Sequence, residues 1–476
     1  MRLTPRFVSK ITASGLLDVL LITSLAASLA ISIFVASRQA WQQVLRPVIY
    51  LDDWPYTHRP YLFQIGELLK WITAQHAEHR KVPTRVLSIL ETEVFRLPIL
   101  TLSGVQSLLL MLLSSGLIAW IAHLAIPRRR DAVLAWLSCS VILFNPWQFS
   151  AYNLSGLNDL FPVNASVLAA ALLLLGYVKH RDTRWQRACT VGMALLPWVS
   201  IFTAGQGFAM AAALVLTCTL VSRRMTVVAF LSSALAVLSF YKILPLVESA
   251  HRGHYGFDPG FLFRLLSGGS WPGLGVITGM VLVMMVLDRA VRNEQHLILH
   301  GPTAAILAMP GLFGLVYALL ITLSRSGYGL DGASPSWYLV SLSLLPVSVI
   351  LLASWIYATV TMQVSAANPQ RPGLTSMLPH LVVVLATLFS FPQVFTGQGV
   401  PYRQALAQVS YRRFELQKSM ECVASNLRKG GTAADPIESS ECEIKDPAAS
   451  EQYKYLSGKK PLKPSGWHLR LTKTGD

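Results

Sequence analysis

The sequence has few charged residues, and acidic residues are the scarcer kind. Asp, Glu, Lys and Arg together make up 13% of the 476 residues, with 24 acidic side chains against 40 basic ones and a formal net charge of +16. Soluble domains contain about 25% charged residues, so this composition excludes an ordinary soluble enzyme. Hydrophobic residues supply 53% of the chain, and its mean hydropathy is +0.47.

The chain also lacks the motifs of several large functional classes. It contains no Walker motif, no G-x-G-x-x-G following a predicted strand and no H-E-x-x-H signature. These absences exclude chemistry driven by a cytoplasmic nucleotide and the common zinc hydrolases. The net positive charge comes without a nucleic-acid-binding motif. It lies mostly in short loops, where it sets membrane topology and contacts anionic headgroups, so we expect no nucleic-acid partner.

Cysteine is rare as well, with five residues in the chain. Cys139, Cys189 and Cys218 fall within apolar runs and are interpreted as small core residues. Cys422 and Cys442 lie in the polar C-terminal tail. These two cysteines can form a disulfide if the tail lies outside the cytoplasm.

Long apolar runs, by contrast, recur along the chain. Runs near 20 residues are long enough to cross a hydrocarbon core of roughly 30 Å, and strands are disfavoured because open sheet edges stay unsatisfied in lipid. The pattern predicts an all-α polytopic membrane protein of about eleven transmembrane helices. The predicted spans cover 17–35, 97–126, 132–144, 161–178, 188–202, 208–221, 227–247, 274–287, 304–323, 338–360 and 377–395.

The distribution of basic residues orients these spans. Arg2, Arg6 and Lys10 precede the first run, which is too long for a signal-peptide core, so we interpret it as an uncleaved anchor with a cytoplasmic N-terminus. Basic clusters then follow the second, fourth, sixth and eighth runs, all on the cytoplasmic side. This topology predicts a transmembrane domain over 1–395 and a small polar tail over 396–476 outside the cytoplasm.

Three outer loops, at 38–96, 248–271 and 324–337, contain the candidate chemistry. In the first loop, apolar residues around 62–72 and 86–94 recur at helical spacing, which predicts amphipathic helices in the membrane interface. The same loop contains the acidic pair Asp52 and Asp53. A carboxylate there suits a general base for an acceptor hydroxyl, or a ligand for a divalent cation that neutralises a phosphate. A solvated turn before Pro55 is the plainer alternative.

Basic and histidine residues complete these loops. The guanidinium groups of Arg80 and Arg325 match phosphate oxygens bidentately. The histidines of His76-Ala77-Glu78-His79 and of His251 to His254 are spaced three residues apart, but they form no complete zinc signature. A mixed-charge interfacial face explains them more simply than a metal site. Lys242, near the end of the seventh run, is expected to extend to the outer interface.

Taken together, these motifs resemble the GT-C superfamily of integral membrane glycosyltransferases, in particular poorly characterised bacterial members. The resemblance covers roughly residues 10–395 and rests on Asp52-Asp53-Trp54, Glu78-His79-Arg80 and Ser324-Arg325-Ser326-Gly327-Tyr328-Gly329. Related sequences often continue from the last motif to a Ser-Arg-Tyr, where this chain has Ser336-Trp337-Tyr338. Trp337 therefore replaces an arginine of the expected phosphate clamp.

The resemblance implies a GT-C-like bundle in the bacterial cytoplasmic (inner) membrane. It implies transfer of a sugar from a polyprenyl-phosphate donor to a glycan, lipid or cell-envelope polymer at the outer face. Asp53, or alternatively Asp52, would be the base or hold a divalent cation such as Mg²⁺ or Mn²⁺, which some members use. Arg80, Arg325 and His79 would contact the donor phosphate. The acceptor side would be lined by Trp54, Glu78, Asn158, Asp159 and Tyr328.

Two alternative functions stay open. A transporter or flippase for a lipid-linked glycan would place polar residues at mid-membrane, often in matched broken helices. The predicted spans contain few deep ionisable residues and no obvious repeat, which disfavours it. The other alternative is a non-catalytic membrane scaffold whose tail, from about Tyr402, recruits a protein partner.

Overall fold

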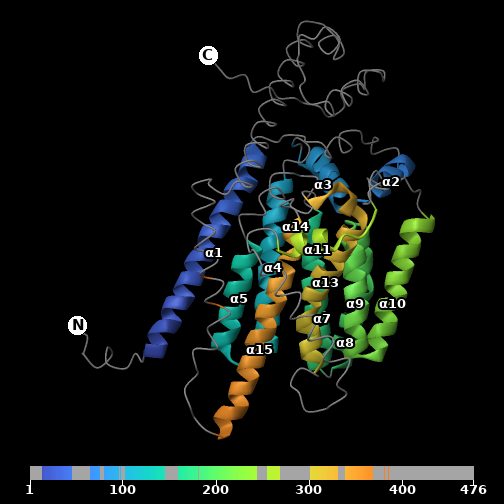
Figure 1. The fold of residues 1–476 in the computed structure, drawn as a ribbon. Coiled ribbons are helices and arrows are strands. Elements are labelled where there is room, and N and C mark those ends of the chain that lie inside the picture. The colour runs from blue at the N-terminus through green and yellow to red at the C-terminus, as the bar shows by residue number, and fades with distance from the viewer. Residues whose placement is uncertain are drawn as a thin grey trace, which may run out of the picture.

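The computed structural model describes residues 13–45, 65–74, 80–95, 97, 102–144, 159–180, 182–243, 255–267, 301–330, 338–367, 380 and 384. Every secondary-structure element within these ranges is a helix (Figure 1). The α-helices are α1 (Ala13–Leu45), α2 (Ile65–Thr73), α3 (Val82–Ile89), α4 (Ser103–Ala125), α5 (Arg129–Leu143), α7 (Leu160–Lys179), α8 (Thr183–Ile201), α9 (Gln206–Val221), α10 (Arg223–Leu238), α11 (Pro259–Ser267), α13 (Pro302–Arg325), α14 (Tyr338–Leu342) and α15 (Leu344–Ala367).

Three short segments of other helix types extend these helices. Leu90–Val94 continues α3 as a π-helix, Ser239–Ile243 continues α10 in the same way, and Ser326–Tyr328 forms a 3-10 turn after α13. Two of the three lie at the ends of long apolar helices, and the third extends the short helix α3. They bring the chain from regular helix into the loops at one end of the bundle.

The prediction of a multi-pass helical membrane protein is confirmed in its coarse form. Six helical stretches are long and apolar enough to cross a bilayer, namely Leu16–Arg38, Ser103–Ala125, Leu160–Lys179, Arg223–Lys242, Pro302–Tyr328 and Tyr338–Thr359. The predicted runs at 132–144, 188–202 and 208–221 are also helical, as α5, α8 and α9, but shorter. The runs at 274–287 and 377–395 lie outside the described residues except for His380 and Val384. The count of eleven spans therefore stays a prediction.

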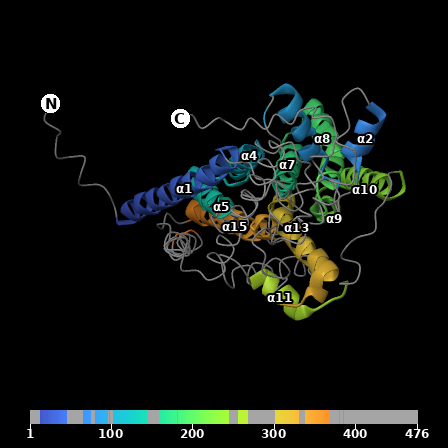
Figure 2. The same cartoon turned by 90° about the horizontal axis from the view of Figure 1, so that it is seen from above.

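Burial separates central helices from peripheral ones. The most apolar windows of α7, α13 and the α14–α15 stretch are 61%, 72% and 78% buried, whereas those of α1 and α10 are each 33% buried. Viewed from above, α1 lies at one side of the bundle and α10 at another, with α7 and α13 between them (Figure 2). The central helices therefore pack against protein, and the outer ones present large apolar side chains outward, as lipid-facing helices do.

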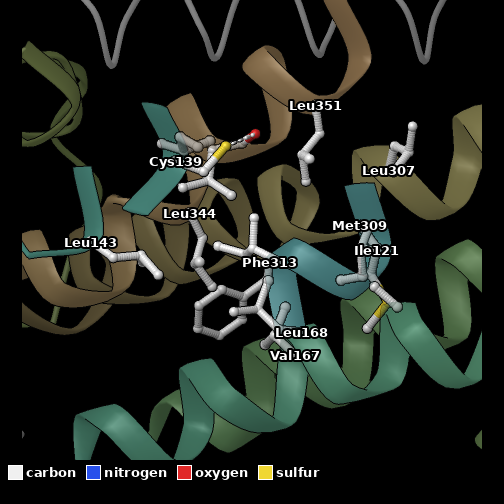
Figure 3. Close-up of a cluster of buried hydrophobic side chains, with 14 of the residues drawn as sticks. Ile121, Cys139, Leu143, Val167, Leu168, Leu307, Met309, Phe313, Leu344 and Leu351 are labelled. Atoms are coloured by element: carbon white, nitrogen blue, oxygen red, sulfur yellow. Dashed lines mark hydrogen bonds between the residues drawn. The ribbon is translucent and has the colours of Figure 1, made fainter. Parts of the chain in front are cut away.

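The core combines branched aliphatic residues with close backbone approach. Phe313 of α13 lies among Val167, Leu168 and Leu344 (Figure 3). A Cβ atom on Gly207 would lie 2.2 Å from the backbone of Ser200, so α8 and α9 meet too closely for any larger residue. Such contact suits membrane bundles, where van der Waals packing rather than the hydrophobic effect holds helices together.

Charge distinguishes the two ends of the bundle. The basic clusters at 128–130, 179–187 and 223–224 join α4 to α5, α7 to α8 and α9 to α10, and they share one end, which we call the basic end. There Lys179 donates to the carbonyl oxygen of Leu124, and Arg130 pairs with Asp18 of α1. The opposite end, with α2 and α3, is called the loop end (Figure 1).

Candidate functional site at the loop end

The polar face of α3 is turned into the protein. The buried residues of this segment are Thr84, Arg85 and Ser88 of α3, together with Arg80 and Lys81 just before it and Glu91 of the π-helix that follows. The apolar residues point outward, since Val86 is 40%, Leu90 41% and Val94 63% exposed. The predicted amphipathic helix therefore exists, with its apolar face directed away from the bundle. An interfacial helix takes this orientation when lipid covers its apolar side.

Asp159 lies against this polar face at the start of α7. The hydroxyl of Thr84 donates a hydrogen bond to its Oδ1. Burial raises the pKa of Asp159 to about 6, although Lys81, the Thr84 hydrogen bond and Arg85 act to lower it. The α7 N-terminus also favours a negative charge there. Within the described residues its buried Oδ2 has no hydrogen-bond partner. The carboxyl group therefore titrates near neutral pH, as proton exchange with a substrate hydroxyl requires.

Arg80 is fully buried and connects the α2–α3 segment to the π-helix that continues α10. Its Nη1 donates to the carbonyl oxygen of Thr73 at 2.6 Å and its Nη2 to that of Phe240 at 2.7 Å. The guanidinium carbon lies 4.5 Å from the centre of the Phe240 ring, in cation–π geometry. Next to it, the backbone N–H of Val82 donates to the carbonyl oxygen of Phe202 at 3.1 Å. In this conformation Arg80 acts as a structural clamp, and its predicted role as a phosphate ligand stays a prediction.

Arg85 stabilises the end of α2. Its Nη1 donates to the carbonyl oxygens of Trp71 at 2.5 Å and of Ile72 at 3.3 Å, and also to that of Ala74. Its guanidinium carbon lies 5.5 Å from the Trp71 ring centre. A cation at the last carbonyls of a helix is favoured by the helix dipole. Arg85 therefore fixes α2 onto α3.

Arg325, at the end of α13, is connected to the tyrosines in the bundle. Its Nη1 donates to the hydroxyl oxygen of Tyr338 at 3.0 Å, and its guanidinium carbon lies 5.8 Å from that ring. The Tyr338 ring packs edge-on against Tyr317, with 6.4 Å between centroids. Arg325 thus contacts one member of a buried aromatic pair. Tyr328, in the turn that follows, is 45% exposed.

The structure describes part of the predicted site. Arg80, Asp159, Arg325 and Tyr328 all lie at the loop end, where Asp159 contacts Thr84 of α3 and Arg80, just before α3, contacts Thr73 and Phe240. The predicted residues Asp52, Asp53, Trp54, Glu78, His79 and Asn158 lie outside the described residues, as do Trp337 and the tail at 396–476. Among the described residues, no group of three or more His, Cys, Asp or Glu side chains is gathered to hold a metal ion.

Sequence reasoning missed Lys81, Thr84 and Arg85. All three lie within the first loop, and with Arg80 they repeat at 80, 81, 84 and 85, the spacing of one helical face. That periodicity was available as a signal. The interfacial helix is predicted from the apolar residues of this segment alone, which do not indicate what its polar face contacts.

Comparison with known proteins identifies no relative. No protein-family model, no curated protein and no solved structure matches the chain. The geometry of the loop end therefore carries the functional argument.

Proposed function

We propose that the protein is a membrane glycosyltransferase that uses a polyprenyl-phosphate sugar at the outer face of the bilayer. The observation that carries this proposal is the buried carboxyl group of Asp159, held by Thr84 beside Lys81 and Arg85 at the loop end. A carboxyl group that titrates near neutral pH and lies beside cations suits a reaction of a hydroxyl with a phosphate-linked group.

In this reaction, a hydroxyl oxygen of the acceptor attacks the anomeric carbon of the sugar. The bond between that carbon and the phosphate oxygen breaks, and polyprenyl phosphate leaves with the bonding electrons. The acceptor proton passes to a carboxylate, for which Asp53 is the first candidate and Asp52 the second. Arg80, Arg325 and His79 are proposed to contact the phosphate. The acceptor would be a glycan, a lipid or a cell-envelope polymer. Its binding site would be lined by Trp54, Glu78, Asn158, Asp159 and Tyr328.

The content of the spans favours transfer over transport. Apart from Lys179 and Arg325 at their last residues, α4, α7, α9 and α13 contain no Asp, Glu, Lys or Arg. Transporters keep ionisable side chains near mid-membrane for their substrates and coupling ions. The charged residues of these helices are instead concentrated at their ends, which suits chemistry at one membrane surface.

The experiment that tests this function compares Asp53→Asn with the unchanged protein in proteoliposomes loaded with undecaprenyl-phosphate sugars. We expect the rate of sugar transfer to fall by about 10²- to 10⁴-fold, the usual effect of losing a general base. Asp52→Asn separates the two candidate acids, and Asp182→Asn, an exposed cap of α8 at the basic end, is the control. Full transfer by both Asp52→Asn and Asp53→Asn would sink the assignment. Movement of the lipid-linked sugar between leaflets without transfer would replace it by a flippase.

A further inference from the structure

Below the loop end, the bundle contains a second polar cluster that the sequence did not indicate. Asn164 of α7 and Gln206 of α9 are 3% and 6% exposed, and Ser341 of α14 is fully buried. Within the described residues, the side-chain oxygen of each has no hydrogen-bond partner. We call Asn164, Gln206 and Ser341, with Tyr317 and Tyr338, the amide cluster.

Hydrogen bonds and ring contacts connect the members of the amide cluster. The Nδ2 of Asn164 donates to the carbonyl oxygen of Val340 at 2.6 Å, next to Ser341 in the chain. The Nε2 of Gln206 donates to the hydroxyl oxygen of Tyr317 at 3.4 Å, and the Tyr317 ring packs against Tyr338. The helices that supply them pack together, since α7 contacts α9, α13 and α14, and α13 contacts α9 and α14.

The orientation of the two amides determines what they can bind. In each, the nitrogen is the atom used by the protein, and the carbonyl oxygen is left over. A carbonyl oxygen only accepts hydrogen bonds, and leaving one buried without a donor is destabilising because its lost hydration is not replaced. The cluster therefore requires donors, and neutral hydroxyl groups are the donors that match neutral amide oxygens in a dry site.

The neighbouring residues relate these oxygens to the proposed donor. Tyr338 contacts both Tyr317 inside the cluster and Arg325 at the end of α13. A phosphate at Arg325 would therefore carry its attached group toward the two tyrosines. Aromatic rings pack well against the C–H faces of pyranose rings, while the amides accept from ring hydroxyls.

We propose that the amide cluster is the subsite for the hydroxyl groups of the sugar attached to the lipid phosphate. This inference rests on the proposed function and deepens it, because it assigns discrimination between sugars to Gln206 and Asn164. Sites built from buried polar groups reject a ligand that lacks the matching hydroxyl, since those groups are then left unpaired. The cluster thus selects the sugar, and Arg325 holds the phosphate.

The test measures binding to the full-length protein in nanodiscs. The probes are undecaprenyl phosphate and its glucose, galactose, mannose and arabinose derivatives. We expect the wild type to bind at least one sugar derivative about 10-fold more tightly than the bare lipid phosphate, and Gln206→Met to reduce this preference by roughly 2- to 10-fold, as loss of a neutral hydrogen bond does. Binding of bare undecaprenyl phosphate should not change. Gln186→Met, which removes a surface amide at the basic end, is the matched control.

Thermal stability gives a second measurement. Because Gln206→Met removes an unsatisfied buried oxygen and only a long hydrogen bond, the ligand-free variant should unfold at the same temperature as the wild type or higher. No preference in the wild type, or full preference in Gln206→Met and Asn164→Leu, overturns the inference. Either of these outcomes leaves the transfer experiment on Asp53 unaffected. If the wild type binds no undecaprenyl phosphate, the proposed function fails instead. Binding of octyl glycosides then tests the subsite. If the wild type discriminates among these glycosides and Gln206→Met does not, the subsite is supported. If the wild type does not discriminate among them, the subsite is overturned.

Discussion

The hydroxyl of Thr84 donates a hydrogen bond to the carboxylate of Asp159, 75 residues further along the chain. Thr84 lies on the buried face of α3, and Asp159 precedes the first residue of α7. The bond joins the α2–α3 segment to a central helix of the bundle. A change at either residue is therefore expected to affect both the position of the loop and the protonation of the carboxyl group.

The raised pKa of Asp159 predicts a specific pH dependence of stability. Burial raises its pKa from 3.8 to about 6 in the folded protein, so the folded state binds this proton more tightly than the unfolded chain. The stabilisation is present when the pH is below about 4 and is lost as the pH rises through about 6. A shift of about two units corresponds to about 3 kcal/mol. Relative to Asp159→Asn, the wild type should therefore lose stability between about pH 4 and about pH 6.

The measurement is the Tm in detergent across that range, for the wild type and Asp159→Asn. Asp182→Asn serves as the control for removal of a carboxylate that is exposed and lies at the basic end. Parallel curves for the wild type and Asp159→Asn would show that the Asp159 proton is not linked to folding.

Arg80→Lys is expected to destabilise the α2–α3 segment. Lysine cannot donate to the carbonyl oxygens of Thr73 and Phe240 in fork geometry while lying over the Phe240 ring. We expect a loss of about 2–4 kcal/mol, the range for breaking a buried charged network. Hydrogen exchange should speed up in α2 and α3 before it does in α7.

Lys70→Ala provides the matched comparison for Arg80. Lys70 is 76% exposed and pairs with Glu67 on the surface of α2. Exposed pairs contribute about 0–1 kcal/mol, so exchange in α2 should barely change. Equal effects of Arg80→Lys and Lys70→Ala would mean that Arg80 is not the clamp described above.

Gly207→Ala tests the close approach of α8 and α9. The new methyl group would lie 2.2 Å from backbone atoms of Ser200, and backbone cannot rotate away as a side chain can. Overpacking of this kind costs about 1–3 kcal/mol, so the Tm should fall. Gly116→Ala in α4 is the control, because nothing lies within 4 Å of its added methyl group. It should be neutral or stabilising by about 0.4–1 kcal/mol.

The ion pair between Asp18 and Arg130 should hold α1 to α5. Their side chains are 22% and 26% exposed, respectively, so the pair is partly shielded from solvent. Asp18→Asn leaves Arg130 without this partner and should lower the Tm. The exchanged pair, Asp18→Arg with Arg130→Asp, should recover part of the loss in a double-mutant cycle. Additive effects would show that the two charges are not coupled.

Much of the bundle could be predicted from the sequence, because hydrocarbon thickness dictates the length of an apolar span. The predicted runs at 97–126, 161–178 and 304–323 correspond to α4, α7 and α13. The basic clusters were equally informative, since a charged loop lies outside the hydrocarbon wherever it occurs. Length and charge are local properties, and local properties are readable in one sequence.

The candidate site was harder to predict because its contacts are distant in sequence. A hydrophobic pattern shows that α3 has an apolar and a polar face, but not which of them contacts the protein. In a soluble protein the apolar face does, whereas at a membrane surface the apolar face can contact lipid instead. The guanidinium of Arg80 bonds to Phe240, 160 residues away. Gln206 and Tyr317 are likewise 111 residues apart. No spacing rule connects such residues, so they become visible only after the helices are packed.

The backbone of Lys81 has φ of 48°, and no other non-glycine residue in the described part of the chain has a positive φ. That conformation costs a residue with a Cβ atom about 1–2 kcal/mol. Glycine would adopt it freely but would bring no ammonium group to the neighbourhood of Asp159. The chain thus accepts a strained turn in order to keep a positive charge at that point. Lys81→Gly should consequently relax this turn and raise the pKa of Asp159, because the positive charge that lowers that pKa is removed. An unstrained backbone and a low pKa of Asp159 therefore cannot both be obtained at position 81.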